Sequence, residues 1–314
     1  MSRRGWALFV AMSLIWGIPY LLIRVAVEDF APGTLVFART VLPVAILLPL
    51  AIHRGLIRPL LPHWRILLLF AVVEIAGPWW LLGAAEQRLT SSTAGLLVAA
   101  VPLIGVVVAL TAGSHDADDR IDARRLLGLA VGFAGVVALV GIEMRGSDLI
   151  AVGQVALCAV GYAVGPVIIA RRLSDFPALG VIAVALTITA AGYAPYALTH
   201  LPDSVSPQSA ASVLVLAVVC TAIAFLLFFA LIAEVGPARA TVITYVNPAI
   251  AVLLGVLLLD EPFNTGIAVG FPLILLGSYL ATAPSRTPEG RTSGPQARAA
   301  EEVRVGDTPI VAEP

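Results

Sequence analysis

Apolar runs of nearly constant length recur along most of this chain, and they constrain its fold more than any other feature. Each run holds roughly 20 residues, the length that crosses the hydrocarbon core of a bilayer as a helix. Short links rich in charged residues, proline and glycine separate the runs. The runs lie near residues 5–27, 34–52, 64–85, 91–112, 124–142, 149–170, 178–199, 209–233, 238–259 and 265–283. The pattern predicts an all-α integral membrane protein with ten transmembrane helices.

The composition agrees with a membrane protein and argues against several other classes. Hydrophobic residues make up 59 % of the chain and charged residues 12 %, whereas a soluble domain carries about 25 % charged residues. The net charge of −1 excludes the bulk basic surface expected of a nucleic-acid binder. The two cysteines, Cys158 and Cys220, lie in separate apolar runs, so we expect neither a disulfide framework nor a zinc site.

The two ends of the chain need separate interpretations. The first run follows the basic start MSRR, as the core of a signal peptide would. It is longer than the hydrophobic region of a usual signal peptide and lacks an A-x-A cleavage site, so we expect a retained helix. Residues 284–314 are rich in Pro, Gly, Ala, Arg and Glu without periodicity, and we expect a disordered cytoplasmic tail.

The positions of the arginines predict the orientation of the helices. Loops rich in basic residues stay in the cytoplasm, and this chain contains arginine but no lysine. With the N-terminus inside, every arginine except Arg24, Arg39, Arg88 and Arg145 lies on the cytoplasmic side. Ten helices return the chain to the side on which it began. We therefore expect a multi-pass plasma-membrane protein with both termini in the cytoplasm.

The two halves of the chain, residues 5–142 and 149–283, resemble each other. When Pro102 in the fourth run is set on Pro248 in the ninth, the neighbouring small and apolar residues match, as do glycines in the following runs. Each half contains five predicted helices, and an odd number places two tandem halves upside down relative to each other. Inverted repeats are typical of secondary transporters, whose substrate site lies near the midplane between the repeats.

The matched segments also resemble a known family. In order and spacing they are similar to the EamA domain of the drug/metabolite transporter superfamily, and the likeness covers about residues 5–283. The residues that carry it are Trp16-Gly17, Phe37-Ala38-Arg39, Ala94 and Pro102 in the first half, and Pro248, Glu261, Gly270 and Gly277 in the second. The resemblance implies a ten-helix carrier of small metabolites, often an exporter of amino acids or related compounds. It does not select the substrate.

The chain departs from the family pattern at two places. The acidic residue that would match Glu261 is missing from the first half, where His115 and Asp116 stand in a longer loop. Glu74 and the Pro78-Trp79-Trp80 run after it are not features expected across the family. We expect Glu261 itself, at the outer end of a helix, to have a structural role.

Glu74 is the most informative single residue. It lies about ten residues into the third run, hence roughly 15 Å deep at 1.5 Å per residue. A carboxylate facing lipid at that depth costs about 2.5–3.5 kcal/mol on the insertion scale, so it should face the bundle interior. One interpretation is a partner for a substrate amine or a carrier of protons. The other is a neutral, hydrogen-bonded structural glutamate.

Other side chains could share that interior. The candidates are Trp16 and Tyr20 in the first run, Tyr162 in the sixth, and Tyr245 and Asn247 in the ninth. Each could line a substrate cavity, or could pack and hydrogen-bond between helices. Arg39 could contact a substrate carboxylate near the outer side, or could snorkel to the surface. Helix kinks are expected at Pro78, Pro102 and Pro248, because proline has no N–H to donate.

The sequence predicts a secondary active transporter that acts as an exporter, and the partners expected are a small molecule, the lipid bilayer and protons. No P-loop, HExxH or GxSxG motif occurs, and the four histidines fall in loops, so we expect no cofactor, metal or enzymatic activity. An intramembrane enzyme and a structural or receptor-like membrane protein stay open as alternatives. Glycine ladders at residues 128–135 and 266–277 could pack within a monomer or across a homodimer.

Overall fold

The structure is a computed structural model and describes residues 2–111, 123–143, 148–236, 240 and 242–282. Regular structure in this described part is entirely helical. The residues predicted to form a disordered tail, 284–314, lie outside it, as does the loop that contains His115 and Asp116.

Some apolar runs contain one α-helix, and others contain two or more short helical segments. The first half contains α1 (Arg3–Gly17), α2 (Pro19–Ala26), α3 (Pro32–His53), the 3₁₀-helix η1 (Arg58–His63), α4 (Trp64–Phe70), the π-helix η2 (Ala71–Ala76), α5 (Gly77–Glu86), α6 (Ser91–Val98), α7 (Val101–Thr111) and α8 (Ala123–Glu143). The second half contains α9 (Leu149–Ile168), the π-helix η5 (Ile169–Leu173), α10 (Ala178–Thr199), α11 (Pro207–Ala217), the π-helix η6 (Val218–Ile223), α12 (Ala224–Val235), α14 (Ile243–Leu258) and α15 (Thr265–Thr282).

Nine helical spans among the described residues are long and apolar enough to cross a membrane, and α14 is a shorter apolar helix. The all-α membrane architecture is therefore confirmed. The count of ten stays a prediction, because residues 237–239 and 241, in the run predicted at 238–259, lie outside the described part.

Proline and glycine account for the places where the spans are interrupted. Pro19 opens α2 directly after the end of α1, and Pro102 is the second residue of α7. Pro78 is the second residue of α5 and follows the π-helical turn η2. Each of these prolines lacks the N–H that would continue the preceding helix. Pro248 instead stands inside α14.

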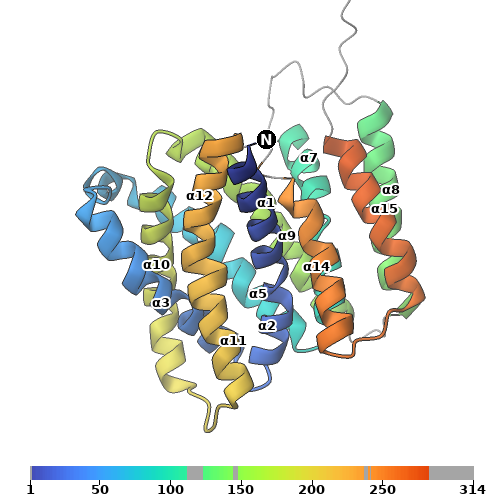
Figure 1. The fold of residues 1–314 in the computed structure, drawn as a ribbon, viewed down its shortest axis with the longest axis horizontal. Helices are drawn as coiled ribbons and strands as arrows, with labels where there is room; N and C mark the ends of the chain where they lie inside the picture. The colour runs from blue at the N-terminus through green and yellow to red at the C-terminus, as the bar shows by residue number, and fades with distance from the viewer. Residues whose placement is uncertain (1, 112–122, 144–147, 237–239, 241, 283–314) are drawn as a thin grey trace, which may run out of the picture. The chain divides into compact units, whose positions relative to one another are not determined.

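Close helix pairs form the frame of the bundle. Helix α15 packs along α8, and α3 packs along α10; Figure 1 shows these pairs on opposite sides of the view. Glycines permit the first contact: a Cβ at Gly128 would lie 2.8 Å from the Gly277 carbonyl oxygen. One at Gly135 would lie 2.7 Å from the Ile274 backbone nitrogen. In this structure the glycine ladders thus pack within one chain.

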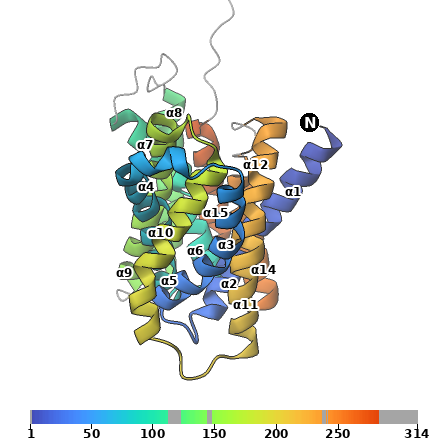
Figure 2. The same ribbon diagram turned by 90° about the vertical axis from the view of Figure 1, so that its left-hand side faces the viewer.

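One end of the bundle gathers the loops 27–31, 87–90, 200–206 and 259–264, and is called here the Glu261 end. Hydrogen bonds connect these loops: Ser206 donates to Asp29, Ser91 donates to Glu261, and Thr34 donates to the His200 carbonyl oxygen. Helix α11 packs against α2 near this end, as Figure 2 shows. Between the two ends, buried apolar side chains form two large clusters that both contact Tyr162.

Candidate functional site

Polar and ionisable side chains from several spans meet inside this bundle. Helices α2, α3, α5 and α9 and the π-helices η2 and η6 each contribute. Helix α5 packs on α2, α3 and α9, η2 packs on α9, and η6 packs on α3. We call this set the central cluster. It consists of Tyr20, Arg39, Glu74, Trp79, Glu86, Cys158, Tyr162 and Cys220, each of which lies near at least one other member.

Arg39 is the cation of the central cluster. Its side chain is 5 % exposed, and its Cζ lies 3.6 Å from the centre of the Trp79 ring. A guanidinium over an aromatic face is attracted by the ring's negative face. Its Nε has no hydrogen-bond partner among the described residues. The snorkelling interpretation therefore does not describe Arg39 here, because α3 turns this side chain inward under Trp79.

Glu74 sits where the third span changes helical form. It belongs to the π-helix η2, and its Oε2 is closed off from solvent without a hydrogen-bond partner among the described residues. The carboxylate rests on Gly165 of α9, where a Cβ would overlap Oε2. Gly165 thus makes the space that Glu74 occupies. Sequence reasoning missed it, since the glycine belongs to another span.

Glu86 is a second carboxylate of the cluster that sequence reasoning missed. It is the last residue of α5 and is fully buried. In the sequence it stands at the boundary between an apolar run and the link EQRLTSS, where acidic residues are ordinarily solvated. Only the packing of α2 and α9 around the end of α5 shows that it faces inward.

Three of the other predicted site residues lie outside the central cluster. Trp16 packs on Phe225 and Phe228 of α12, with ring centroids 6.1 Å and 4.6 Å away. Tyr245 bonds to Thr282 of α15 at 2.5 Å. The amide of Asn247, oriented to donate, reaches the carbonyl oxygens of Ile243 and Ser13 at 2.9 and 3.2 Å. Except for the Asn247–Ile243 contact inside α14, these contacts join different helices.

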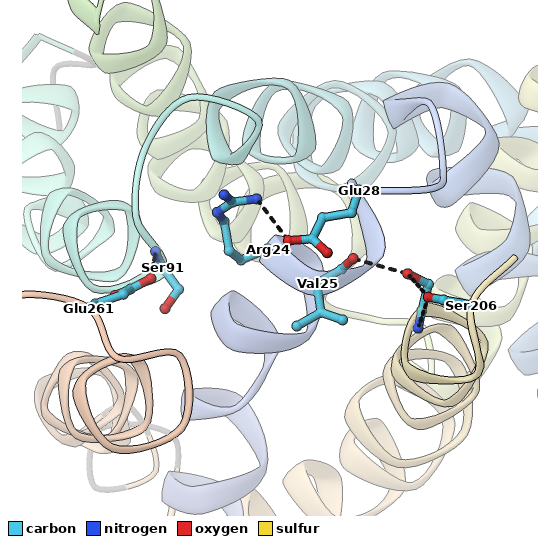
Figure 3. Close-up of polar contacts among 7 residues, drawn as sticks. Arg24, Val25, Glu28, Ser91, Ser206 and Glu261 are labelled. Carbon is cyan, nitrogen blue, oxygen red and sulfur yellow. Dashed lines mark hydrogen bonds and ion pairs between the residues drawn. The ribbon is translucent and has the colours of Figure 1, made fainter.

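Glu261 joins the second half of the chain to the first. Its Oε1 accepts a 2.7 Å hydrogen bond from the Ser91 backbone N–H, and its Oε2 accepts a 3.0 Å bond from the Ser92 N–H. These donors belong to the first turn of α6, where N–H groups lack partners within the helix and negative charge is favourable. Figure 3 shows Glu261 beside Ser91. The contact is consistent with the predicted structural role.

Further polar contacts close the Glu261 end. The Ser206 N–H and hydroxyl both donate to Asp29 Oδ2, at 2.8 and 2.7 Å. These bonds lower the pKa of the Asp29 carboxyl below its ordinary value, because they stabilise the ionised form. Ser209 donates to the Val25 carbonyl oxygen at 3.1 Å. Arg24 pairs with Glu28 at 3.7 Å, as Figure 3 shows.

A metal centre is not indicated by this geometry. No group of three or more His, Cys, Asp or Glu side chains within the described ranges could hold a metal ion. The arrangement instead offers two buried carboxylates, one buried guanidinium and aromatic surfaces, which can bind charged groups of a small molecule or exchange protons.

Comparison with known proteins identifies the family of this chain. The sequence pattern of the EamA-like transporter family matches residues 3–141 and again residues 149–283. The chain belongs to the EamA-like transporter family. Its two family segments make it a multi-pass membrane protein of a transporter family, and family membership points to transport rather than catalysis.

Individual EamA-like relatives support the same assignment. The "uncharacterized inner membrane transporter YedA" of Escherichia coli (strain K12) is 31 % identical, over 88 % of this chain and 92 % of its own length. An "uncharacterized transporter" of Archaeoglobus fulgidus is 23 % identical, over 90 % and 99 %. A solved crystal structure superposes with a TM-score of 0.62 at 22 % identity, over 90 % and 97 %, and this likeness shows the fold alone.

Proposed function

We propose that this EamA-like protein is a secondary active transporter that exports a small metabolite, such as an amino acid or a related compound, in exchange for protons. The observation that carries the proposal is Glu74, a membrane-embedded carboxylate whose Oε2 is closed off from solvent and has no hydrogen-bond partner among the described residues. Ionisable groups inside a membrane protein are costly, and they mark pathways for ions and substrates.

In this proposal the central cluster binds the substrate. Glu74 receives the cationic part of the substrate or a proton, and Arg39 receives an anionic part. Tyr20 and Tyr162 supply aromatic surface to the site, since both pack in the apolar cluster that contains Cys158. Trp79 holds the guanidinium of Arg39 in place from the other side.

The proposed transport cycle requires two inverted five-helix repeats, residues 5–142 and 149–283, with ten helices in all. Support comes from the internal match around Pro102 and Pro248 and from the two family segments. The distribution of arginine supports cytoplasmic termini, which makes the Glu261 end the outer end. Substrate sites near the midplane, between inverted repeats, are a recurring arrangement in secondary transporters.

The test is transport by the purified protein in proteoliposomes. Radiolabelled amino acids, nucleosides and quaternary amines are screened for counterflow and for uptake driven by an imposed pH gradient. Glu74→Gln keeps the shape of the side chain but cannot ionise. We expect it to fold, to lose pH-driven transport, and to leave the pH profile of any residual exchange flat.

The matched control is Asp203→Asn, which removes an exposed carboxylate at the Glu261 end and should transport like the parent. If Glu74→Gln retains the parent's rate and pH profile, Glu74 is a neutral structural residue and the proposed site fails.

A further inference from the structure

Two carboxylates at the Glu261 end reach from one half of the chain to the other. Asp29, in the link after α2, accepts hydrogen bonds from the N–H and hydroxyl of Ser206 in the second half, at 2.8 and 2.7 Å. Glu261, in the link after α14, accepts from the N–H groups of Ser91 and Ser92 in the first half, at 2.7 and 3.0 Å. We call these two contacts the latches. Each half supplies the carboxylate of one latch and the donors of the other.

Both latches bind the start of a helix. Ser206 is the N-cap of α11, and Ser91 and Ser92 are the first two residues of α6. N–H groups at a helix start lack partners within the helix, and the helix dipole favours negative charge there. Hydrogen bonds to an ionised acceptor are also stronger than neutral ones. The latches therefore stabilise the state in which this end is closed, and both must break before it can open.

The opposite end of the bundle lacks the counterpart of the Asp29 latch. When Asp29-Phe30 is set on Asp175-Phe176, Asp175 falls in the link before α10, at the end of that helix remote from the Glu261 end. Asp175 is exposed, and within the described residues its side chain accepts only a 3.4 Å contact from the adjacent Ser174. This link meets the first half through the rings of Phe176 and His63, whose centroids are 4.8 Å apart, and this contact involves no carboxylate.

Two further contacts of the Glu261 end are not repeated in the sequence. The match of Pro102 with Pro248 places His115 at the position of Glu261. Thr34 donates to the His200 carbonyl oxygen at 2.9 Å, whereas Leu179, which has no hydroxyl, stands at the matched position in the second half. Inverted halves with equivalent contacts would favour closure of either end equally. The polar contacts of this chain are unequal, and they favour closure of the Glu261 end.

We propose that the latches bias the protein toward the state in which the Glu261 end is closed, so that at rest the central cluster opens toward the opposite side. With cytoplasmic termini that side is the cytoplasm, where an exporter binds its substrate. Opening of the Glu261 end requires water to replace Asp29 and Glu261 at the starts of α11 and α6. The proposal rests on the proposed function, in which the two halves move relative to each other, and adds which state is favoured at rest.

The native cysteines of the central cluster can report whether the Glu261 end is open. Cys158 and Cys220 are buried. A small impermeant methanethiosulfonate is applied to the full chain from the side on which Asp203→Cys is labelled, and mass spectrometry follows the modification of each native cysteine. When opening and closing are faster than the thiol reaction, its rate is proportional to the open fraction. Asp29→Asn and Glu261→Gln should each raise the rates, and the double variant should raise them about tenfold or more.

Asp175→Asn is the matched control. It makes the same substitution as Asp29→Asn at the repeat-related residue, which forms no latch, so its rates should equal those of the parent. Parent-like rates in the double variant would overturn the proposal, as would an equal increase in Asp175→Asn. Neither outcome depends on transport. If the transport screen fails while the double variant raises the rates, the proposed function is contradicted and the latches are supported.

Two further variants separate opening of this end from a general loss of structure. Should the double variant not fold, Ser206→Ala removes only one hydroxyl donor and should still raise the rates; parent-like rates would count against the proposal. Asp29→Cys with Ser206→Cys, in the Glu261→Gln protein, places two thiols where the native side chains are in contact. Copper phenanthroline oxidises them to a disulfide, which should return the rates of Cys158 and Cys220 to those of the parent until it is reduced. Rates that stay high in the oxidised protein would exclude the latch mechanism.

Discussion

At the residue scale, two carboxylates inside this protein rest on glycine. A Cβ at Gly165 would overlap the Glu74 carboxylate, and a Cβ at Gly255 would overlap the Glu261 carboxylate. The two acids differ in what they contact: Glu261 accepts hydrogen bonds from the first turn of α6, whereas Glu74 Oε2 has no partner within the described residues. A glycine therefore makes room for the carboxylate at both sites, although one carboxylate caps a helix and the other is unpaired within the membrane.

Gly165→Ala should displace Glu74 without removing it. Because the added methyl group would occupy the space of the carboxylate, we expect the transport rate to fall about tenfold. This factor corresponds to about 1.4 kcal/mol. The proteoliposome assay with the substrate identified in the screen measures the effect. Gly153→Ala is the matched control on α9, since its Cβ would meet nothing within 4 Å. Equal rates for the two variants would show that the position of Glu74 does not matter.

At the scale of elements, the helices of the Glu261 end are held by carboxylates that reach across the bundle. Glu261 connects the link before α15 to α6, and Asp29 connects the link after α2 to the start of α11. Each bond joins segments from different halves of the chain. In a carrier whose halves move relative to each other, these bonds stabilise the state in which this end is closed.

Glu261→Ala should destabilise the protein measurably. The variant leaves the buried N–H groups of Ser91 and Ser92 without their acceptor, which costs about 1–3 kcal/mol. Thermal unfolding in detergent, followed by circular dichroism, should show a lower Tm. Asp260→Asn changes the neighbouring exposed acid, which has a positive φ of 51° that asparagine tolerates. A Tm for Glu261→Ala as high as that of Asp260→Asn would contradict the capping role.

The Asp29–Ser206 contact should make stability depend on acidic pH. Its hydrogen bonds lower the pKa of Asp29 in the folded protein. A carboxyl whose folded-state pKa is depressed stabilises the fold above its ordinary pKa of about 3.9 and loses that effect as pH falls through the lowered value. The Tm difference between the parent and Asp29→Asn should thus be present at neutral pH and vanish in this acidic range. A difference that is constant with pH would exclude the ionised contact.

At the scale of the whole molecule, the orientation in the membrane determines which loops face the cytoplasm and which face the outside. The proposed cytoplasmic termini place Arg58 inside and the 200–206 loop outside. Both native cysteines, Cys158 and Cys220, are buried, so background labelling should be low. Asp203→Cys in intact cells should react with an impermeant maleimide, and Arg58→Cys should react only after permeabilisation. The reverse pattern would contradict the proposed orientation.

Apolar length and internal repetition made much of this protein predictable from its sequence. Runs of spanning length predict membrane helices whatever their neighbours are, because the bilayer requires each span to satisfy its own backbone hydrogen bonds. The resemblance to the EamA domain, confirmed by the two family segments, follows from residues whose order is visible in the chain. The depth of Glu74 could be estimated in the same way, from its position within one run.

Which side chains meet was decided by tertiary structure. Arg39 stood near a run end and Glu86 at a run boundary, where surface exposure is the ordinary expectation, yet both are buried. Arg39 is covered by Trp79, and Glu86 lies at the end of α5, on which α2 and α9 pack. In both cases the covering segment lies far away in the sequence. Trp16 and Tyr20 are one helical turn apart in the sequence but pack in different apolar clusters, because the helix is interrupted between α1 and α2. Hydrophobic periodicity specifies that a helix has an inner face, but the partner that covers this face is set by packing between distant segments.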